Sequence, residues 1–184
     1  GDEILAMPSG KTTTVERIVS FDGDLEEAFT PQAVTLTLGD EIDVSRGDML
    51  VRPNNVPRRE RLFEAMIVWM HDTPLVEGRS YVLKVGTQSV PAEVRHVRYR
   101  FDMNQLHRAE PNQIDGLPGL GLNEVGRLLF EASRSLLFDP YKKNRATGNF
   151  VVIDRVSNVT VGAGMILDRS AGGVAADKEL LEAS

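Results

Sequence analysis

The closing part of the chain, residues 144–166, constrains the fold most, because it contains two short apolar runs with a polar turn between them. The first run is Phe-Val-Val-Ile at 150–153, the second begins at Val159, and residues 155–158 between them are polar enough for a surface turn. Such runs are typical of a hairpin whose strands are buried on at least one face. Gly162 and Gly164 would share one face of the second strand. Either a neighbour packs closely there, or the chain bends at a barrel corner.

The remainder of the chain consists mostly of short segments in which apolar and polar residues alternate, as half-buried strands do. Residues 62–70 form the most hydrophobic segment. The spacing of their apolar residues is compatible with a helix or a strand, and their composition favours a strand. One helical turn is conceivable at 25–28, but no segment reaches the roughly 12 residues below which isolated helices are marginal. We therefore expect an all-β protein. The other expected strands are residues 3–7, 12–20, 32–38, 49–51, 81–85, 90–101, 122–132 and 134–138.

Two modules are expected, because residues 53–61 have the composition of a linker. This segment contains two prolines, two asparagines, and Arg58, Arg59 and Arg61. The basic cluster is either solvated or a docking patch for an acidic surface. We place the modules at residues 1–54 and 55–168, followed by a tail at 169–184 that is helical or disordered. Residues 102–120, rich in glycine and proline, are expected to be the least ordered part of the second module.

The composition excludes several classes of protein. The 184 residues are 41% hydrophobic, which is enough for a core, and carry a net charge of -6, which disfavours binding to nucleic acid. The absence of cysteine rules out a disulfide scaffold and a cysteine-based metal site. The three histidines are scattered without metal-ligand spacing, and no apolar run approaches the ~20 residues of a membrane span. The acidic N-terminus lacks the basic region of a signal peptide, so we expect a cytoplasmic protein without a membrane contact.

No motif in the chain predicts catalysis. Gly10-Lys11-Thr12 matches the end of a phosphate-binding loop, but Leu5 stands where the first glycine of that loop is required, and a threonine-rich strand follows instead of a helix. A hairpin turn is the expected structure. Neither a nucleophile elbow nor an acid–base pair of carboxylates is present. We therefore predict no catalytic, cofactor-binding or metal-binding residue in this chain.

Several motifs nevertheless resemble one family, in order and in spacing. They are Met7-Pro8-Ser9-Gly10-Lys11, Phe21-Asp22-Gly23-Asp24, residues 40–48, Trp69-Met70, residues 122–126, Asp139-Pro140-Tyr141, residues 144–148 and residues 160–165. Together they resemble the second and third domains of the large subunit of bacterial ATP sulfurylase, sulfate adenylyltransferase subunit 1, a GTPase built like elongation factor Tu. The resemblance covers about residues 1 to 167. It implies two β-barrel modules, of which the first is incomplete because the match begins part-way through it.

This resemblance also implies a function. In that family, GTP hydrolysis drives the formation of adenylylsulfate from ATP and sulfate; the large subunit binds GTP with Mg2+, and a small subunit carries out adenylyl transfer. In some relatives an adenylylsulfate kinase follows. The GTPase domain has no counterpart in this sequence, so none of its nucleotide-binding residues can be transferred. We expect no cofactor in this chain, with GTP and Mg2+ confined to the GTPase domain.

The expected role is a non-catalytic one in assembly, in which the barrels dock the GTPase domain, the small catalytic subunit, or both. Arg46, Asn144 and Arg145 are the interface candidates, because they lie in segments bounded by turn residues and arginine suits anionic partners. The alternative is that these side chains are only solvated. A second hypothesis is a free-standing β-barrel interaction module from a truncated paralogue. A third, nucleic-acid contact by analogy with translation factors, is opposed by the acidic charge.

Overall fold

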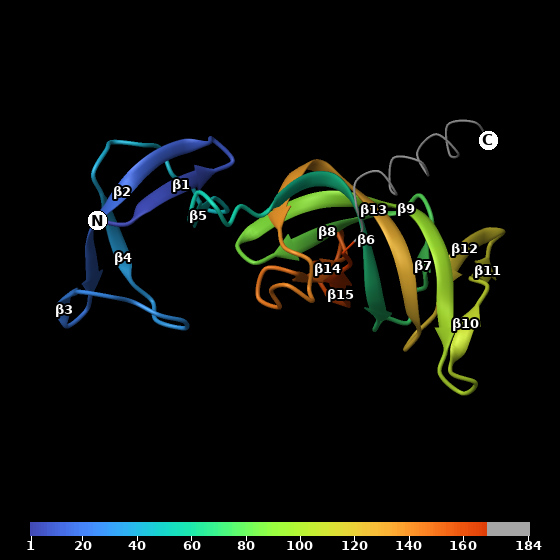
Figure 1. Cartoon of the computed structure of the whole chain (residues 1–184). Coiled ribbons are helices and arrows are strands. Elements are labelled where there is room, and N and C mark those ends of the chain that lie inside the picture. The colour runs from blue at the N-terminus through green and yellow to red at the C-terminus, as the bar shows by residue number, and fades with distance from the viewer. Residues whose placement is uncertain (169–184) are drawn as a thin grey trace. The chain divides into compact units, whose positions relative to one another are not determined.

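The computed structural model describes residues 1–168, and all regular secondary structure within these residues is β-strand (Figure 1). This confirms the all-β prediction. No helix within the described part of the chain is long and apolar enough to cross a membrane. The chain divides into two compact units, Gly1–Pro57 and a second that begins at Arg58. The tail expected at 169–184 lies outside the described residues.

The first unit is an open antiparallel sheet. Its strands are β1 (Glu3–Met7), β2 (Lys11–Ser20), β3 (Gly23–Leu25), β4 (Thr35–Leu38) and β5 (Met49–Val51). Their order is β3-β2-β1-β5, with β4 also paired to β2, and no pairing among residues 1–57 closes the sheet into a ring. The expected incomplete barrel is therefore confirmed. Its only buried hydrophobic side chains are Ile4 and Ala6.

A tight turn joins β1 to β2 at Gly10. This glycine has a φ of 76°, a left-handed conformation that glycine adopts without strain, and its N–H donates to the Ala6 carbonyl at 2.8 Å. Lys11 then begins β2 and pairs with Ala6. The predicted hairpin turn at Gly10-Lys11-Thr12 is confirmed. The helical turn considered at 25–28 is wrong, because Leu25 ends β3 and irregular chain follows.

The second unit contains a closed barrel. Its strands are β6 (Arg58–Trp69), β7 (Leu75–Val76), β8 (Ser80–Val85), β9 (Gln88–Asp102), β10 (His107–Ala109), β11 (Asn112–Ile114), β12 (Leu117–Leu120), β13 (Val125–Phe138), β14 (Asn149–Ile153) and β15 (Thr160–Ile166). The ring runs β9-β13-β6-β15-β14-β8 and returns to β9. Inside it, the phenylalanine rings 63, 130, 138 and 150 pack with centroids 5.5–5.9 Å apart.

Three details of the second unit differ from the prediction. The arginines assigned to a linker, Arg58, Arg59 and Arg61, belong to β6, because the backbone of residues 58–60 pairs with the end of β13. The two strands expected at 122–132 and 134–138 are one strand with an irregularity between Glu131 and Leu136. Residues 102–120 include β10, β11 and β12, so their glycines and prolines mark turns between short strands instead of a structureless loop.

The two glycines of β15 both lie on its buried face, as the period of two predicts. A Cβ atom at Gly164 would lie 2.6 Å from Ile67 Cδ1 and 2.7 Å from Phe150 Cε1. At Gly162 it would lie 3.1 Å from both Trp69 Cε3 and the Val68 carbonyl oxygen. Close packing by neighbours therefore accounts for both glycines, and at Gly164 the neighbours are side chains of the aromatic core.

Candidate functional site

The interface candidate in the first unit, Arg46, lies in the loop between β4 and β5. Asp48 holds this loop: its carboxylate accepts the Ser45 N–H at 2.9 Å, and its own N–H donates to the Ser45 carbonyl at 3.0 Å. Gly47 has a φ of 104°, which a side chain would strain. The turn therefore presents Arg46 to solvent, where its side chain is exposed.

The other two candidates lie in the loop between β13 and β14. Asp139 organises this loop by accepting Lys143 Nζ at 2.8 Å and Thr147 Oγ1 at 3.0 Å. Gly148 is buried so tightly that a Cβ atom would lie 2.6 Å from the Tyr141 nitrogen. The loop is thus built by its own contacts, as compact functional loops often are.

At the tip of this loop, Asn144 and Arg145 are both exposed. The Asn144 side-chain oxygen accepts the Ala146 N–H at 3.0 Å, which fixes the turn. The Arg145 guanidinium stands 5.9 Å from the centre of the Tyr141 ring, a cation–π distance. The structure brings these two candidates together and places Arg46 in the other unit. None of the contacts that these three side chains make within residues 1–168 identifies a ligand.

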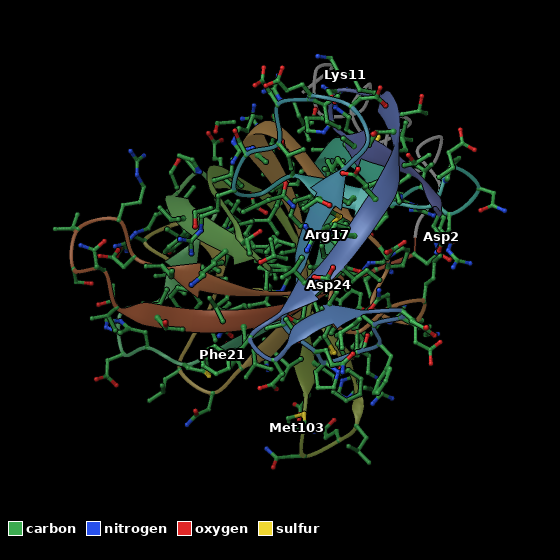
Figure 2. All side chains as sticks on the ribbon, turned by 90° about the vertical axis from the view of Figure 1, so that its left-hand side faces the viewer. Asp2, Lys11, Arg17, Phe21, Asp24 and Met103 are labelled. Carbon is green, nitrogen blue, oxygen red and sulfur yellow. The ribbon has the colours of Figure 1, made fainter. Side chains whose placement is uncertain are left out.

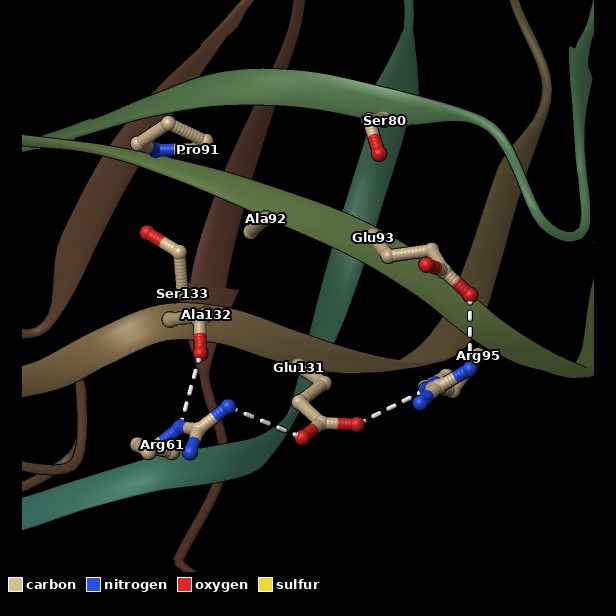
Figure 3. A pocket seen from close by; sticks show the side chains of 9 residues that line it. All are labelled: Arg61, Ser80, Pro91, Ala92, Glu93, Arg95, Glu131, Ala132 and Ser133. Carbon is tan, nitrogen blue, oxygen red and sulfur yellow. Dashed lines mark hydrogen bonds and ion pairs between the residues drawn. The ribbon is translucent and has the colours of Figure 1, made fainter.

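A groove on the outside of the barrel gathers a network of four charged side chains (Figure 3). Its cavity volume is about 220 Å3, and β6, β8, β9 and β13 contribute to its wall. Glu131 accepts Arg61 Nη2 at 3.2 Å and Arg95 Nε at 2.8 Å, and Arg95 also donates to Glu93 at 2.7 Å. Arg61 Nε donates to the Ala132 carbonyl at 3.1 Å, where β13 departs from regular pairing.

This network is electrically balanced, because two arginines face two carboxylates. The hydrogen bond to Glu131 raises the pKa of the Arg95 guanidinium, so that group stays charged at every physiological pH. All four side chains are partly solvated, and exposed ion pairs contribute little, typically about 0–1 kcal/mol each. The groove therefore presents arginine and glutamate side chains that are paired with one another.

A second cavity, of about 270 Å3, lies beside Trp69 and Tyr81. Their rings meet edge to face at 5.4 Å, and Trp69 Nε1 donates to the Thr73 carbonyl at 2.9 Å. Arg79 stands 5.6 Å from the Tyr81 ring and 3.4 Å from the Asp154 carboxylate. Burial raises the pKa of the Tyr81 phenol to about 12, so it stays protonated and is not a general base near neutral pH.

Within residues 1–168, no group of three or more histidine, aspartate or glutamate side chains could hold a metal ion. Sequence reasoning missed the groove residues Glu93, Arg95 and Glu131, and it placed Arg61 in a linker. Part of the signal was present, since Glu93 and Arg95 are two apart on an alternating strand and therefore share a face. Arg61 and Glu131 are 70 residues apart in the sequence, and only the pairing of β6 with β13 brings them together.

Comparison with known proteins agrees with this architecture. The model of the family described as GTP-eEF1A C-terminal domain-like matches residues 62–167, which include the whole closed ring except the first residues of β6. The chain belongs to this family. The solved structure of Sup35 complexed with GDP matches with a TM-score of 0.78 and 18% sequence identity, over 92% of this chain and 40% of that one. At that identity the likeness shows the fold, and it confirms the barrel architecture predicted from the sequence.

Curated relatives confirm the more specific resemblance. Sulfate adenylyltransferase subunit 1 of Alteromonas mediterranea is 47% identical over 94% of this chain and 35% of that protein. The subunit 1 of Bacteroides fragilis is 46% identical over 92% of this chain and 34% of its own length. The bifunctional enzyme CysN/CysC of Rhodopirellula baltica is 49% identical over 94% of this chain and 26% of that protein. The chain thus spans about a third of the length of these relatives, or less.

Proposed function

We propose that this chain is a non-catalytic barrel portion of the GTPase subunit of a sulfate adenylyltransferase, which forms adenylylsulfate from ATP and sulfate in the cytoplasm. The observation that carries the proposal is identity of 46–47% over 92–94% of the chain with proteins named sulfate adenylyltransferase subunit 1. In this proposal the barrels hold a GTPase domain and a small catalytic subunit. GTP and Mg2+ bind to that GTPase domain, and adenylyl transfer takes place on the small subunit.

The physical character of the second unit suits such a role. A closed barrel has no free sheet edges in its ring and a packed aromatic interior, so it is rigid, and its loops present fixed groups to a partner. The loop that carries Asn144 and Arg145 is fixed by Asp139 and by the buried Gly148. A preorganised surface loses less conformational freedom on binding, which favours assembly.

The test is direct binding of the whole chain to the small subunit of the same organism's enzyme, measured by isothermal titration calorimetry and confirmed by a pull-down. We expect saturable binding in the nanomolar to micromolar range, which corresponds to about -12 to -8 kcal/mol. A purified GTPase domain of subunit 1 is the second probe. If neither protein binds, this proposal is wrong, and a free-standing interaction module with another partner becomes the better hypothesis.

A further inference from the structure

The outer face of the barrel carries a row of apolar side chains that are not part of the buried interior. Cross-strand pairing places five outward-facing residues side by side on β9, β13, β6, β15 and β14. They are Phe101, Val125, Val68, Ala163 and Val151, here called the apolar row. Each is at least partly exposed, and Val68 is 37% exposed. Along a barrel strand, outward-facing residues are normally polar and alternate with inward-facing apolar residues. An uninterrupted row of outward-facing apolar residues therefore requires an explanation.

The next outward row adds to this surface. Tyr99, Arg127, Met66 and Met165 are paired in register two residues further along the same strands. Met165 is 38% exposed, and the Tyr99 hydroxyl lies 3.9 Å from the Met66 sulfur. Methionine side chains are flexible and polarisable, and they are frequent on surfaces that fit against other proteins. The two rows together form one continuous face across the sheet.

The charged residues at the two ends of the apolar row are cations. The apolar row ends at Arg108 of β10 on one side and at Lys84 of β8 on the other, and both side chains are exposed. Arg127 lies in the second row. Neither row contains a carboxylate. Arg127 donates to the fully buried Glu64 at 2.7 Å through Nε, and this ion pair balances the charge of Arg127.

Acidic residues also lie next to the ends of these strands, namely Asp102, Glu124 and Asp154, and each accepts hydrogen bonds within its own turn. Asp102 accepts the N–H groups of Asn104 and Gln105 at 2.8 and 3.1 Å. Glu124 accepts the Gly121 N–H at 2.7 Å and the Asn112 amide at 2.6 Å. The two ends of the apolar row are nevertheless cationic, at Arg108 and Lys84, on a chain of net charge -6, and such a local charge selects partners through charge complementarity.

We propose that this face, the apolar row with Tyr99, Met66 and Met165 beside it, is a protein-docking surface for a partner whose apolar patch is bordered by carboxylates. A symmetric pair of copies would bring the cationic row ends, Arg108 and Lys84, of one copy against those of the other, which disfavours self-association through this face. A nucleic-acid surface would be built around phosphate contacts, whereas the centre of this face is aliphatic. This inference rests on the proposed function, in which the partner is the small subunit.

The test compares the wild-type chain with three variants for binding to the small subunit. Val68→Glu puts a carboxylate at the centre of the face and should weaken binding by about 30-fold or more. The new carboxylate would lose its water on binding and would be repelled by the carboxylates that border the partner's patch. Val68→Lys introduces an equally polar side chain, but its positive charge complements the carboxylates of the partner, so it should weaken binding only about 3-fold. Val156→Glu, at a residue 91% exposed in the β14–β15 turn, is the control and should leave the affinity unchanged.

Methionine methyl NMR on the wild-type complex provides a second readout that does not depend on any variant. The Met66 and Met165 signals should shift on addition of the small subunit. Equal binding by all four proteins, or shifts confined to Met7 and Met49 of the first unit, would overturn the docking surface while leaving the proposed function standing. If the wild type does not bind at all, the proposed function itself has failed. A different result would be that the chain dimerises or retains a short RNA duplex and that Val68→Glu abolishes this binding. Such a result would assign the face to another occupant and would also overturn the proposed docking surface.

Discussion

The two units of this chain are both antiparallel sheets, yet they differ in how much apolar surface they bury. Except for Ile4 and Ala6, every buried hydrophobic side chain in residues 1–168 belongs to the second unit. In the first unit the counterparts on the inner face, such as Val15, Leu36 and Leu38, are paired across strands but only half-buried. Pairing alone therefore does not make a core. Closure of the ring places two inner faces opposite each other, and burial follows from that.

The first unit relies more on its solvated contacts. Arg17 and Asp24, which lie side by side in Figure 2, form two hydrogen bonds at 2.8 and 2.9 Å across β2 and β3. Both side chains are about half exposed, so water and salt screen their attraction. Phe21, at the tip of the same hairpin, is fully exposed. The second unit is therefore stabilised by its buried interior, whereas the first unit has little buried interior.

The largest expected effect is the loss of an aromatic ring from the closed core. Phe130→Ala removes a fully buried side chain that packs against Phe63 and Phe150, and should destabilise the second unit by about 3–5 kcal/mol. Ile4→Ala in the first unit is the matched change and should leave the second unit's transition unaltered. Urea unfolding followed by Trp69 fluorescence measures this, since every Trp and Tyr lies in the second unit. A Phe130→Ala midpoint equal to that of wild type would contradict the account of the core.

The glycines of β15 should show a smaller and graded effect. Gly164→Val and Gly162→Val both overpack the interior, which typically costs about 1–3 kcal/mol. We expect Gly164→Val to be the worse, because its Cβ would meet Ile67 and Phe150 at closer distances than Gly162 meets Trp69. Met165→Val, on the outward face of the same strand, is the control. The reverse order in urea midpoints would show that the strand shifts to relieve the contacts at Gly164.

Backbone protection should separate the two units without any mutation. We expect amides of residues 3–51 to exchange at least about tenfold faster than those of the closed ring, because opening free energies range from near zero in fraying segments to the global value in cores. The unpaired edges of the first unit also favour association between chains. Hydrogen exchange by mass spectrometry and sedimentation at several concentrations test both points. A monomer with uniformly slow exchange across residues 3–51 would remove the contrast between the units.

A salt titration distinguishes two carboxylates whose pKa values are lowered for different reasons. In the first unit the hydrogen bond from Arg17 lowers the pKa of Asp24, and in the second the Ser157 backbone N–H lowers that of Asp154. Each therefore stabilises the fold above the unfolded pKa of about 3.9, and this contribution is lost as the pH falls through the lower folded pKa. Salt at about 1 M weakens an exposed pair of opposite charges more than it weakens a hydrogen bond from a backbone N–H, so the pKa of Asp24 should rise toward its usual value and that of Asp154 should change less. Carbon-13 NMR of the two carboxyl groups measures this, and equal changes would count against the assignment.

The smallest expected effect is none at all. Lys11→Ala should leave folding unchanged, and the chain should not bind GTP or ATP, because the Gly10 N–H is already bonded to Ala6 and Lys11 enters a paired strand. Phosphate binding needs several converging backbone N–H groups, usually at a helix N-terminus. Calorimetry with GTP and Mg2+ tests this. Saturable micromolar binding that Lys11→Ala abolishes would show that the first unit holds a nucleotide site.

The fold class could be predicted because a strand shows its period of two locally, and Gly162 and Gly164 could be assigned to one face for the same reason. The candidate site could be predicted less well. Asn144 and Arg145 do lie in a loop, but their role at an interface stays a prediction, and the groove around Glu131 was missed. Arg58, Arg59 and Arg61 were misassigned because the composition of a segment contains no information about the strand with which it pairs.

By itself, the sequence determined the all-β class, the two modules and the family, since these depend on local periodicity and on motifs in order along the chain. Only the tertiary structure decided the register between strands that are distant in sequence. That register places Val68 beside Val125 and Ala163 and so creates the apolar row, and it sets Phe150 against Gly164. The physical reason is that a strand's backbone hydrogen bonds are the same for every residue, so the choice of partner depends on how the whole barrel buries its interior.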